Sequence, residues 1–264
     1  MKTNQIIDEK SQFRAVVPLK GATIETKDGK TVGKCGDFLF DDENWTIRYI
    51  VANTGGFFSR NEVLMSPFVF KNPEFGNYHQ SMQTVLSEDW IESSPPLEAH
   101  SPVSRKYELE LARHFGYPLY WTGTYLWGGN PHPMPGMLDP NEPARHEEKM
   151  AEIGESRLRS CDEVVGYEVI SNGESIGKVD DFIVETHPWR IRYLVVRTGN
   201  WMFGKRVILS PEWVADISWE ENEITMTGPD REQIESAPAF DPSDGVNRDY
   251  EGRLYDYYGR RYYW

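Results

Sequence analysis

The strongest constraint on this chain is a sequence that it contains twice. Residues 45–51 read WTIRYIV, and residues 189–195 read WRIRYLV. When each residue is set against the one 144 positions later, residues 33–67 align with 177–211 without a gap, and 14 of the 35 pairs are identical. Chance would give about two identities, so the chain holds two copies of one unit. The period is too long for a solenoid and indicates tandem domains.

Each copy has the pattern of short strands joined by tight turns. Ile47, Tyr49 and Val51 alternate with Arg48 and Ile50, which is the period of a β-strand. The pairs Asp28-Gly29 and Asn172-Gly173 are typical of hairpin turns. Five or six such strands per copy predict a small barrel or sandwich.

A short helix is expected after the strands of each copy. Ser87 is a suitable N-cap in the first copy, and Pro229 suits the first helical position in the second. Further on, residues 107–121 (YELELARHFGYPLYW) match residues 250–264 (YEGRLYDYYGRRYYW) at six of 15 places. These tails carry many aromatic rings, so we expect each to pack on a barrel or on its counterpart. A partner-binding aromatic patch is the alternative.

The repeat divides the chain into three parts. Residues 1–121 form the first unit with its helical and aromatic tail, and residues 160–264 form the second. Residues 122–159 lie between them, as a linker rich in glycine and proline followed by a polar helix. Eleven of the 28 residues in 116–143 are glycine or proline, which favours irregular, partly extended structure.

Charge and composition exclude several classes of protein. The net charge of −14 offers no basic face to a nucleic acid, so no nucleic-acid partner is expected. The N-terminus has no signal-peptide pattern, and no apolar run is long enough to span a bilayer, so no direct membrane insertion is expected. Two cysteines, Cys35 and Cys161, occupy non-equivalent places in the two copies, which favours a reducing, cytoplasmic setting.

Catalytic, metal-binding and cofactor-binding patterns are not found, so we expect no enzyme and no cofactor. The six histidines have no partner at helical metal-site spacing. No sequence fits a nucleophile elbow or a phosphate-binding loop. The acidic pairs Asp41-Asp42 and Asp180-Asp181 are read as solvated turns.

Arg48 and Arg192 stand at the same place in both copies, and we expect each to pair across the barrel wall with a carboxylate. The carboxylates proposed for this role are Asp37 and Asp181.

The best functional candidates are two hairpin tips that should be polar but are aromatic. Tryptophan, phenylalanine and arginine are the residues that protein interfaces enrich. The alternative is that each tip covers a barrel mouth. The candidate partner-binding residues are Phe57, Phe58, Arg60, Trp201, Met202, Phe203, Lys205 and Arg206.

The sequences GKVDDFIV, WRIRYLVV and LSPEWV of the second copy resemble the PRC-barrel family, over residues 160–240 and again over 18–95. That family includes the cytoplasmic domain of the photosynthetic reaction-centre H subunit and the C-terminal domain of a ribosome maturation factor. The resemblance implies a mainly β fold of two tandem small β-barrels, each followed here by a short helix and an aromatic tail. It also implies docking modules rather than active sites.

The function that we expect is therefore a non-enzymatic adaptor that binds another protein or a membrane-associated complex. Such an adaptor would be cytoplasmic or peripheral to the inner membrane, and homo-oligomers are left open. Two alternatives remain: an H-subunit-like accessory in light-driven electron transfer, and a ligand binder or enzyme at the interface between the barrels.

Overall fold

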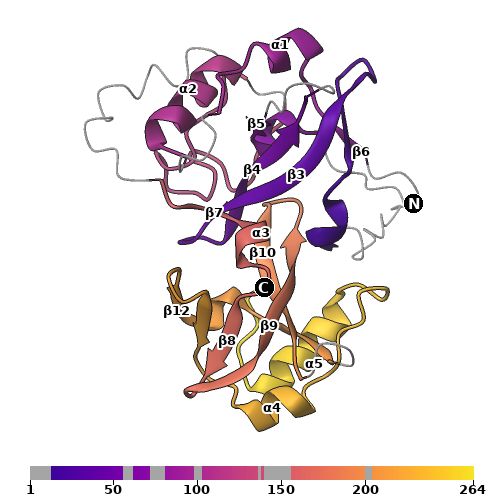
Figure 1. Cartoon of the computed structure of the whole chain (residues 1–264), viewed down its shortest axis with the longest axis vertical. Coiled ribbons are helices and arrows are strands. Elements are labelled where there is room, and N and C mark those ends of the chain that lie inside the picture. Colours follow the sequence, from indigo (N-terminus) through magenta and orange to yellow (C-terminus); the bar gives the residue numbers. More distant parts are fainter. Residues whose placement is uncertain are drawn as a thin grey trace, which may run out of the picture. The chain divides into compact units, whose positions relative to one another are not determined.

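The computed structural model describes residues 13–55, 62–71, 81–97, 103–135, 138–139, 156–199 and 204–264. Its strands outnumber its helices, which confirms the mainly β prediction (Figure 1). The chain divides into two compact units. The described residues of 18–162 and 187–190 form what we call the first-repeat unit. Those of 1–17, 163–186 and 191–264 form the second-repeat unit.

The first-repeat unit is built on a ladder in the order β5-β4-β3-β2-β6. Only the β2–β6 pair is parallel. After β5 a 3-10 turn, η3 (Pro67–Val69), leads to Phe70, which bridges to Thr84 beyond β6, at the other end of the ladder. The strands are β2 (Thr23–Glu25), β3 (Thr31–Asp41), β4 (Thr46–Asn53), β5 (Glu62–Met65) and β6 (Ser81–Gln83).

The second-repeat unit repeats this ladder in the order β11-β10-β9-β8-β13-β12. Again one pair, β13–β8, is parallel, and a 3-10 turn, η5 (Pro211–Trp213), follows the strand that matches β5. The strands are β8 (Glu168–Ser171), β9 (Glu174–Glu185), β10 (Arg190–Arg197), β11 (Arg206–Leu209), β12 (Val214–Ser218) and β13 (Glu223–Met226).

The strand that leads each repeat is exchanged. β1 (Phe13–Ala15) precedes the first repeat but pairs with β9 of the second. Reciprocally, β7 (Leu158–Ser160) precedes the second repeat but pairs with β3 of the first. Short turns follow each of them, η2 (Val17–Leu19) and α3 (Cys161–Val164). The division predicted from the sequence follows the repeats. Each compact unit of the structure instead includes the leading strand of the other repeat.

The repeated tryptophans, Trp45 and Trp189, lie in the hairpin turns that enter β4 and β10. Both have a positive φ, 51° and 59°, which costs a residue with a side chain about 1 kcal/mol. Both indole rings are buried, and Trp45 stacks on Phe40 with 5.3 Å between ring centroids. Burial of an indole offsets this backbone cost, which explains why the same large residue stands at both turns.

A short helix follows each barrel, as expected: α1 (Glu88–Glu92) and α4 (Arg231–Ser236). The N-cap prediction holds for Ser87 in position, although its side chain makes no capping bond. In the second repeat the predicted helix start is wrong by two residues. Asp230 is the N-cap and forms a capping box with Gln233, so Pro229 precedes the helix instead of opening it.

The aromatic tails are mainly helical, which the sequence analysis did not predict. They form α2 (Arg105–Phe115) and α5 (Arg248–Tyr258). Ser104 and Asn247 cap the N-termini, each accepting a bond from the backbone N–H of the third residue after it. Gly116 and Gly259 end the helices in the left-handed conformation, with φ of 73° and 61°. Most of the polar helix predicted in the linker lies outside the described residues.

An arginine holds each tail against its barrel. All of β4 except Asn53 is buried, Arg48 included. Arg48 donates from Nε to Asp41 Oδ2 at 2.6 Å, and its guanidinium lies 4.0 Å from the ring centre of Tyr120 in the tail. Arg192 likewise pairs with Glu185 at 2.6 Å and lies 4.2 Å from the ring of Tyr263. The predicted tail packing thus has a specific anchor in each unit.

The predicted partners of these arginines were wrong. Asp37 lies opposite Val51 in the β3–β4 ladder and accepts hydrogen bonds from Ser160 and Asp162, whereas Asp41 lies opposite Thr46 near the turn. Asp181 is occupied by backbone N–H groups instead. The carboxylate that reaches each arginine is the one at the end of the hairpin, Asp41 or its counterpart Glu185.

A buried glutamate in each tail helix completes the connection. Glu108 is fully buried and accepts from Tyr120 Oη at 2.9 Å and from Arg105 Nη1 at 3.1 Å. Burial raises the pKa of Glu108. In the second repeat, Glu251 accepts from Tyr193 Oη at 2.5 Å, which joins α5 directly to β10. Loss of one partner in such a network leaves a buried charge uncompensated.

Replacing Arg48 with methionine is therefore expected to destabilise the protein by about 3 kcal/mol or more, because Asp41 would remain buried and unpaired. The matched change Arg192→Met should cost about 1–2 kcal/mol, because the side chains of that pair are 15% and 13% exposed and water can solvate Glu185. Urea denaturation of both variants measures the difference. Equal losses, or a larger loss for Arg192→Met, would contradict the proposed role of Arg48.

Candidate docking site

Most of the predicted tip residues lie outside the described residues. This holds for Phe57, Phe58 and Arg60 of the first tip and for residues 201–203 of the second, which are Trp201, Met202 and Phe203. The partner-binding prediction for these six residues therefore stays a prediction. The structure places the two basic residues that follow, Lys205 and Arg206.

Lys205 and Arg206 both contact their own unit. Lys205 Nζ donates to the carbonyl oxygens of Glu235, at 3.0 Å, and of Ala237, at the end of α4. Arg206 Nε donates to Asp180 Oδ2 at 2.6 Å, and Asp180 also pairs with Arg197 at 3.0 Å. These contacts bind β11 to α4 and to β9.

Two equivalent aspartates hold the exchanged strands. Asp181 Oδ1 accepts from the backbone N–H groups of Val16 at 3.0 Å and Val17 at 2.8 Å, just after β1. Asp37 accepts from Ser160 Oγ at 2.5 Å and from the backbone N–H of Asp162 at 3.2 Å, just after β7. The two aspartates, which are identical in the aligned repeats, therefore have the same structural role: each binds the chain next to an exchanged strand.

Burial raises the pKa of both Asp37 and Asp181 to about 6, although their hydrogen bonds act in the opposite direction. The native state therefore binds protons at these sites between about pH 4 and 6, where the same groups in the unfolded chain are ionised. Since the folded-state pKa is raised, the stability associated with these groups is present at low pH and is lost as the pH rises through 6.

Other reactive groups in the described residues are buried or dispersed. Cys35 is a free thiol, and burial raises its pKa to about 12, which keeps it protonated at neutral pH. Within the described ranges no three His, Cys, Asp or Glu side chains are grouped as metal ligands. Among those same residues, no helix is both long and apolar enough to span a membrane.

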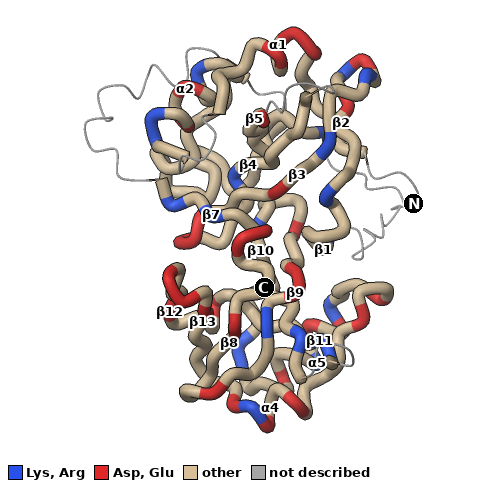
Figure 2. Tube along the Cα trace, viewed as in Figure 1, with Lys and Arg blue, Asp and Glu red and all other residues tan. Residues whose placement is uncertain are grey.

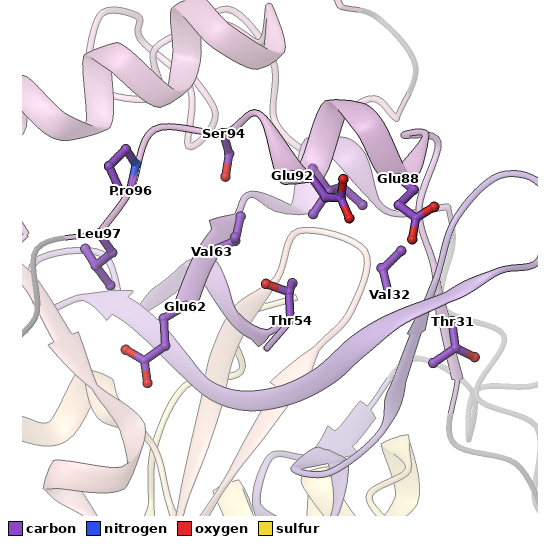
Figure 3. A pocket seen from close by; sticks show the side chains of 11 residues that line it. Thr31, Val32, Thr54, Glu62, Val63, Glu88, Glu92, Ser94, Pro96 and Leu97 are labelled. Atoms are coloured by element: carbon purple, nitrogen blue, oxygen red, sulfur yellow. The ribbon is translucent and has the colours of Figure 1, made fainter. Parts of the chain in front are cut away.

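The feature of the first-repeat unit best suited to binding is an open groove beside β5, with a cavity volume of about 490 Å³ (Figure 3). One wall is the start of β3 and the base of the β4–β5 hairpin, and the other is α1 with the segment that follows it. Thr54 and Glu62 stand on either side of the first predicted tip. The lining residues are Thr31, Val32, Thr54, Glu62, Val63, Glu88, Ile91, Glu92, Ser94, Pro96 and Leu97.

The groove has an apolar floor and an acidic rim. Val63 and Ile91 are buried at its base, and Leu97 remains partly exposed. Glu88 and Glu92 lie on α1, where Figure 2 shows acidic residues along the helix, and Glu62 of β5 lies at the other end of the groove in Figure 3. Glu88 pairs with Lys30. Within the described part of the chain, neither Glu62 nor Glu92 forms an ion pair.

The tail helix fixes the outer wall of this groove. Trp90 of α1 donates from Nε1 to the carbonyl oxygen of His114 at 3.1 Å, and His114 Nε2 lies 2.9 Å from the carbonyl oxygen of Trp90. Beyond α1, Tyr107 Oη donates to the carbonyl oxygen of Pro95 at 2.9 Å. The anchored tail therefore positions both α1 and the segment that carries Ser94 and Leu97.

The equivalent groove of the second-repeat unit is filled by its own chain. Phe240, which corresponds to Leu97, is buried and lies 6.1 Å from the ring of Tyr250. The backbone N–H of Phe240 donates to the carbonyl oxygen of Arg206 at 2.8 Å, so the segment after α4 lies against β11. Lys205 closes the space further by binding the carbonyl oxygens at the end of α4.

The charged groups near the wall also differ between the repeats, through three substitutions. The ionic group Asp180, Arg197 and Arg206 of the second repeat corresponds to Gly36, Asn53 and Glu62 in the first. A Cβ atom added at Gly36 would lie 2.5 Å from the side-chain amide of Asn53, so an acid at that place would require the Asn53 side chain to move. In the second repeat the carboxylate of Asp180 is paired with two arginines. In the first repeat Glu62 makes the corresponding wall of the open groove acidic.

Sequence reasoning located the tips but missed this groove. The signal was present in the alignment, because Arg206 is replaced by Glu62 and Phe240 by Leu97. Its meaning depends on α1 and β5 being neighbours across the groove, which the repeat pattern alone does not show.

The two raised pKa values give a test of the strand anchors. Replacing Asp37 and Asp181 by asparagine should flatten the fall in stability between pH 5 and 7, by about 1 kcal/mol per site relative to the wild type. Asparagine does not ionise, so its burial has no pH-dependent cost. Its side-chain oxygen can still accept the hydrogen bonds from the backbone N–H groups. Urea midpoints at pH 5, 6 and 7 give the measurement. An unchanged slope in the double variant would show that these carboxylates are not the groups that titrate.

Comparison with known proteins agrees with the architecture. The sequence profile of the PRC-barrel domain matches residues 12–77 and 157–233, which together span more than half of the chain. Among curated proteins, no sequence matches it significantly. Each matched segment begins at an exchanged strand; the first extends past β5 and η3, and the second extends past β13. The chain belongs to the PRC-barrel family and carries two copies of its domain.

Proposed function

We propose that this chain is a non-enzymatic, cytoplasmic docking protein that binds another protein through the first-repeat groove. The observation that carries the proposal is the contrast between the two repeats. One groove is filled by Phe240 and closed by Lys205, whereas its counterpart is open over an apolar floor. A cavity of about 490 Å³ with a buried apolar base and a charged rim is suited to receiving a side chain of a partner.

The chemistry of the lining supports binding rather than catalysis. The groove contributes three glutamates, hydroxyl groups and aliphatic side chains, and its lining contains neither histidine nor cysteine. The buried ionisable groups of this unit, Glu108 and Arg48, are used to hold the tail. The two cysteines are buried and unbonded, as suits a reducing compartment. Roles in light-driven electron transfer or at the interface between the barrels stay predictions.

Filling the groove with a large side chain tests this function. Ser94→Trp places an indole in the groove, and Glu220→Trp places the same ring on the exposed β12–β13 turn of the second repeat. Tagged wild-type chain and the Glu220→Trp control are expected to recover one partner protein from extracts of the source cells. Ser94→Trp should recover about tenfold less, because a blocked hot-spot pocket loses more than 1 kcal/mol.

The unfolding transition of Ser94→Trp, followed by urea denaturation, should match that of the wild type, so that loss of the partner cannot be attributed to unfolding. Recovery of the partner by Ser94→Trp at the wild-type level would place the docking surface elsewhere on the chain.

A further inference from the structure

We propose that the first-repeat groove binds an extended, basic segment of its partner that inserts one large apolar side chain. The inference rests on the proposed docking function and adds the chemistry of the partner. It follows from treating the segment that fills the second-repeat groove as a template for the missing occupant of the first.

The template shows what kind of group the groove accepts. In the second repeat, residues 237–240 lie against β11 without forming a strand, and one backbone N–H, that of Phe240, binds the carbonyl oxygen of Arg206. The phenyl ring of Phe240 is buried beside Tyr250. An occupant of the first groove would make the same kind of contact, with a backbone N–H toward β5 and a ring in the cavity.

The first repeat leaves room for such a ring. Leu97 replaces Phe240 and is partly exposed, and Tyr107, the counterpart of Tyr250, is also less buried than its equivalent. Val63 and Ile91 complete the apolar base. A phenylalanine or leucine side chain that covers this base would bury apolar surface worth about 1.5–3 kcal/mol.

The charge of the rim selects the remainder of the segment. In the second repeat, the cations come from the unit itself: Arg206 pairs with Asp180, and Lys205 donates to backbone carbonyl oxygens at the end of α4. The first repeat has Glu62 at the position of Arg206, and Glu92 adds a second carboxylate across the groove. The positive charge must then come from the partner, because an acidic segment would meet like charges at both walls.

The whole chain favours the same partner. Its net charge of −14 repels acidic proteins and attracts basic ones over a range set by the salt concentration. A basic segment would therefore associate quickly at low salt and more slowly as salt is added. The apolar floor of the groove fixes where the partner segment binds, and the acidic rim selects a segment with positive charge.

Fluorescence anisotropy with labelled octapeptides tests the inference directly on the full chain. The probe alternates lysine with alanine and carries one central phenylalanine; two companions replace the lysines with glutamate or the phenylalanine with alanine. We expect the basic aromatic peptide to bind at low salt, and each companion to bind at least about tenfold more weakly. The double variant Glu62→Lys, Glu92→Lys should lose at least about tenfold in affinity for the probe.

A matched control has the same change in charge far from the groove in sequence. Glu220→Lys, Glu221→Lys alters two exposed acids on the β12–β13 turn and should retain affinity for the probe within about twofold. Equal binding of the acidic peptide, or equal losses in the two double variants, would overturn the inference. In that event, partner recovery by Ser94→Trp would still decide separately whether the groove docks a protein at all.

Discussion

The buried contact between each tail helix and its barrel is the interaction on which the rest of each unit depends. Arg48 stacks against Tyr120, and Tyr120 in turn donates to the buried Glu108 of α2. With α2 held in this way, its residues His114 and Tyr107 bind the backbone of α1 and of the segment beyond it. The outer wall of the groove therefore depends on a tail helix that is held by a network of satisfied buried polar groups.

The same framework carries two different surfaces. Both repeats have the arginine on the central strand, the buried glutamate and the glycine that ends the tail helix. They differ at the rim, where an ionic group of three residues in the second repeat becomes Gly36, Asn53 and Glu62 in the first. Duplication thus preserved the residues that hold the fold and changed those that decide whether the groove is filled.

Much of the fold could be predicted from the repeat, because residues that hold one architecture recur at a fixed offset. The mainly β barrels and the short helices after them were predicted and are confirmed by the structure. The tail helices were missed, although Ser104 and Gly116 are a good cap and stop and the apolar spacing between them is helical. Their many aromatic residues, which have weaker helix propensity, obscured that signal.

The strand exchange and the arginine partners could not be predicted, because both depend on which segments meet in space. Local sequence does not distinguish a strand that pairs within its own repeat from a strand that pairs with the other repeat. Asp37 and Asp181 were therefore assigned to the arginines, although they bind the backbone next to the exchanged strands. The tips were predicted because aromatic residues in a turn are anomalous in sequence alone. The groove needed the fold, since its walls come from β3, the β4–β5 hairpin and α1.

The central claim is that the two repeats share one scaffold and that, among the described residues, the first-repeat groove is open whereas Phe240 fills its counterpart. Methyl NMR of the full chain, titrated with the basic aromatic octapeptide, tests it most directly. The account predicts that the methyl signals of Val32, Val63 and Leu97 shift with a common affinity, while those of Val207 and Ile234 in the filled groove do not. Shifts confined to the second repeat, or equal shifts in both, would contradict it.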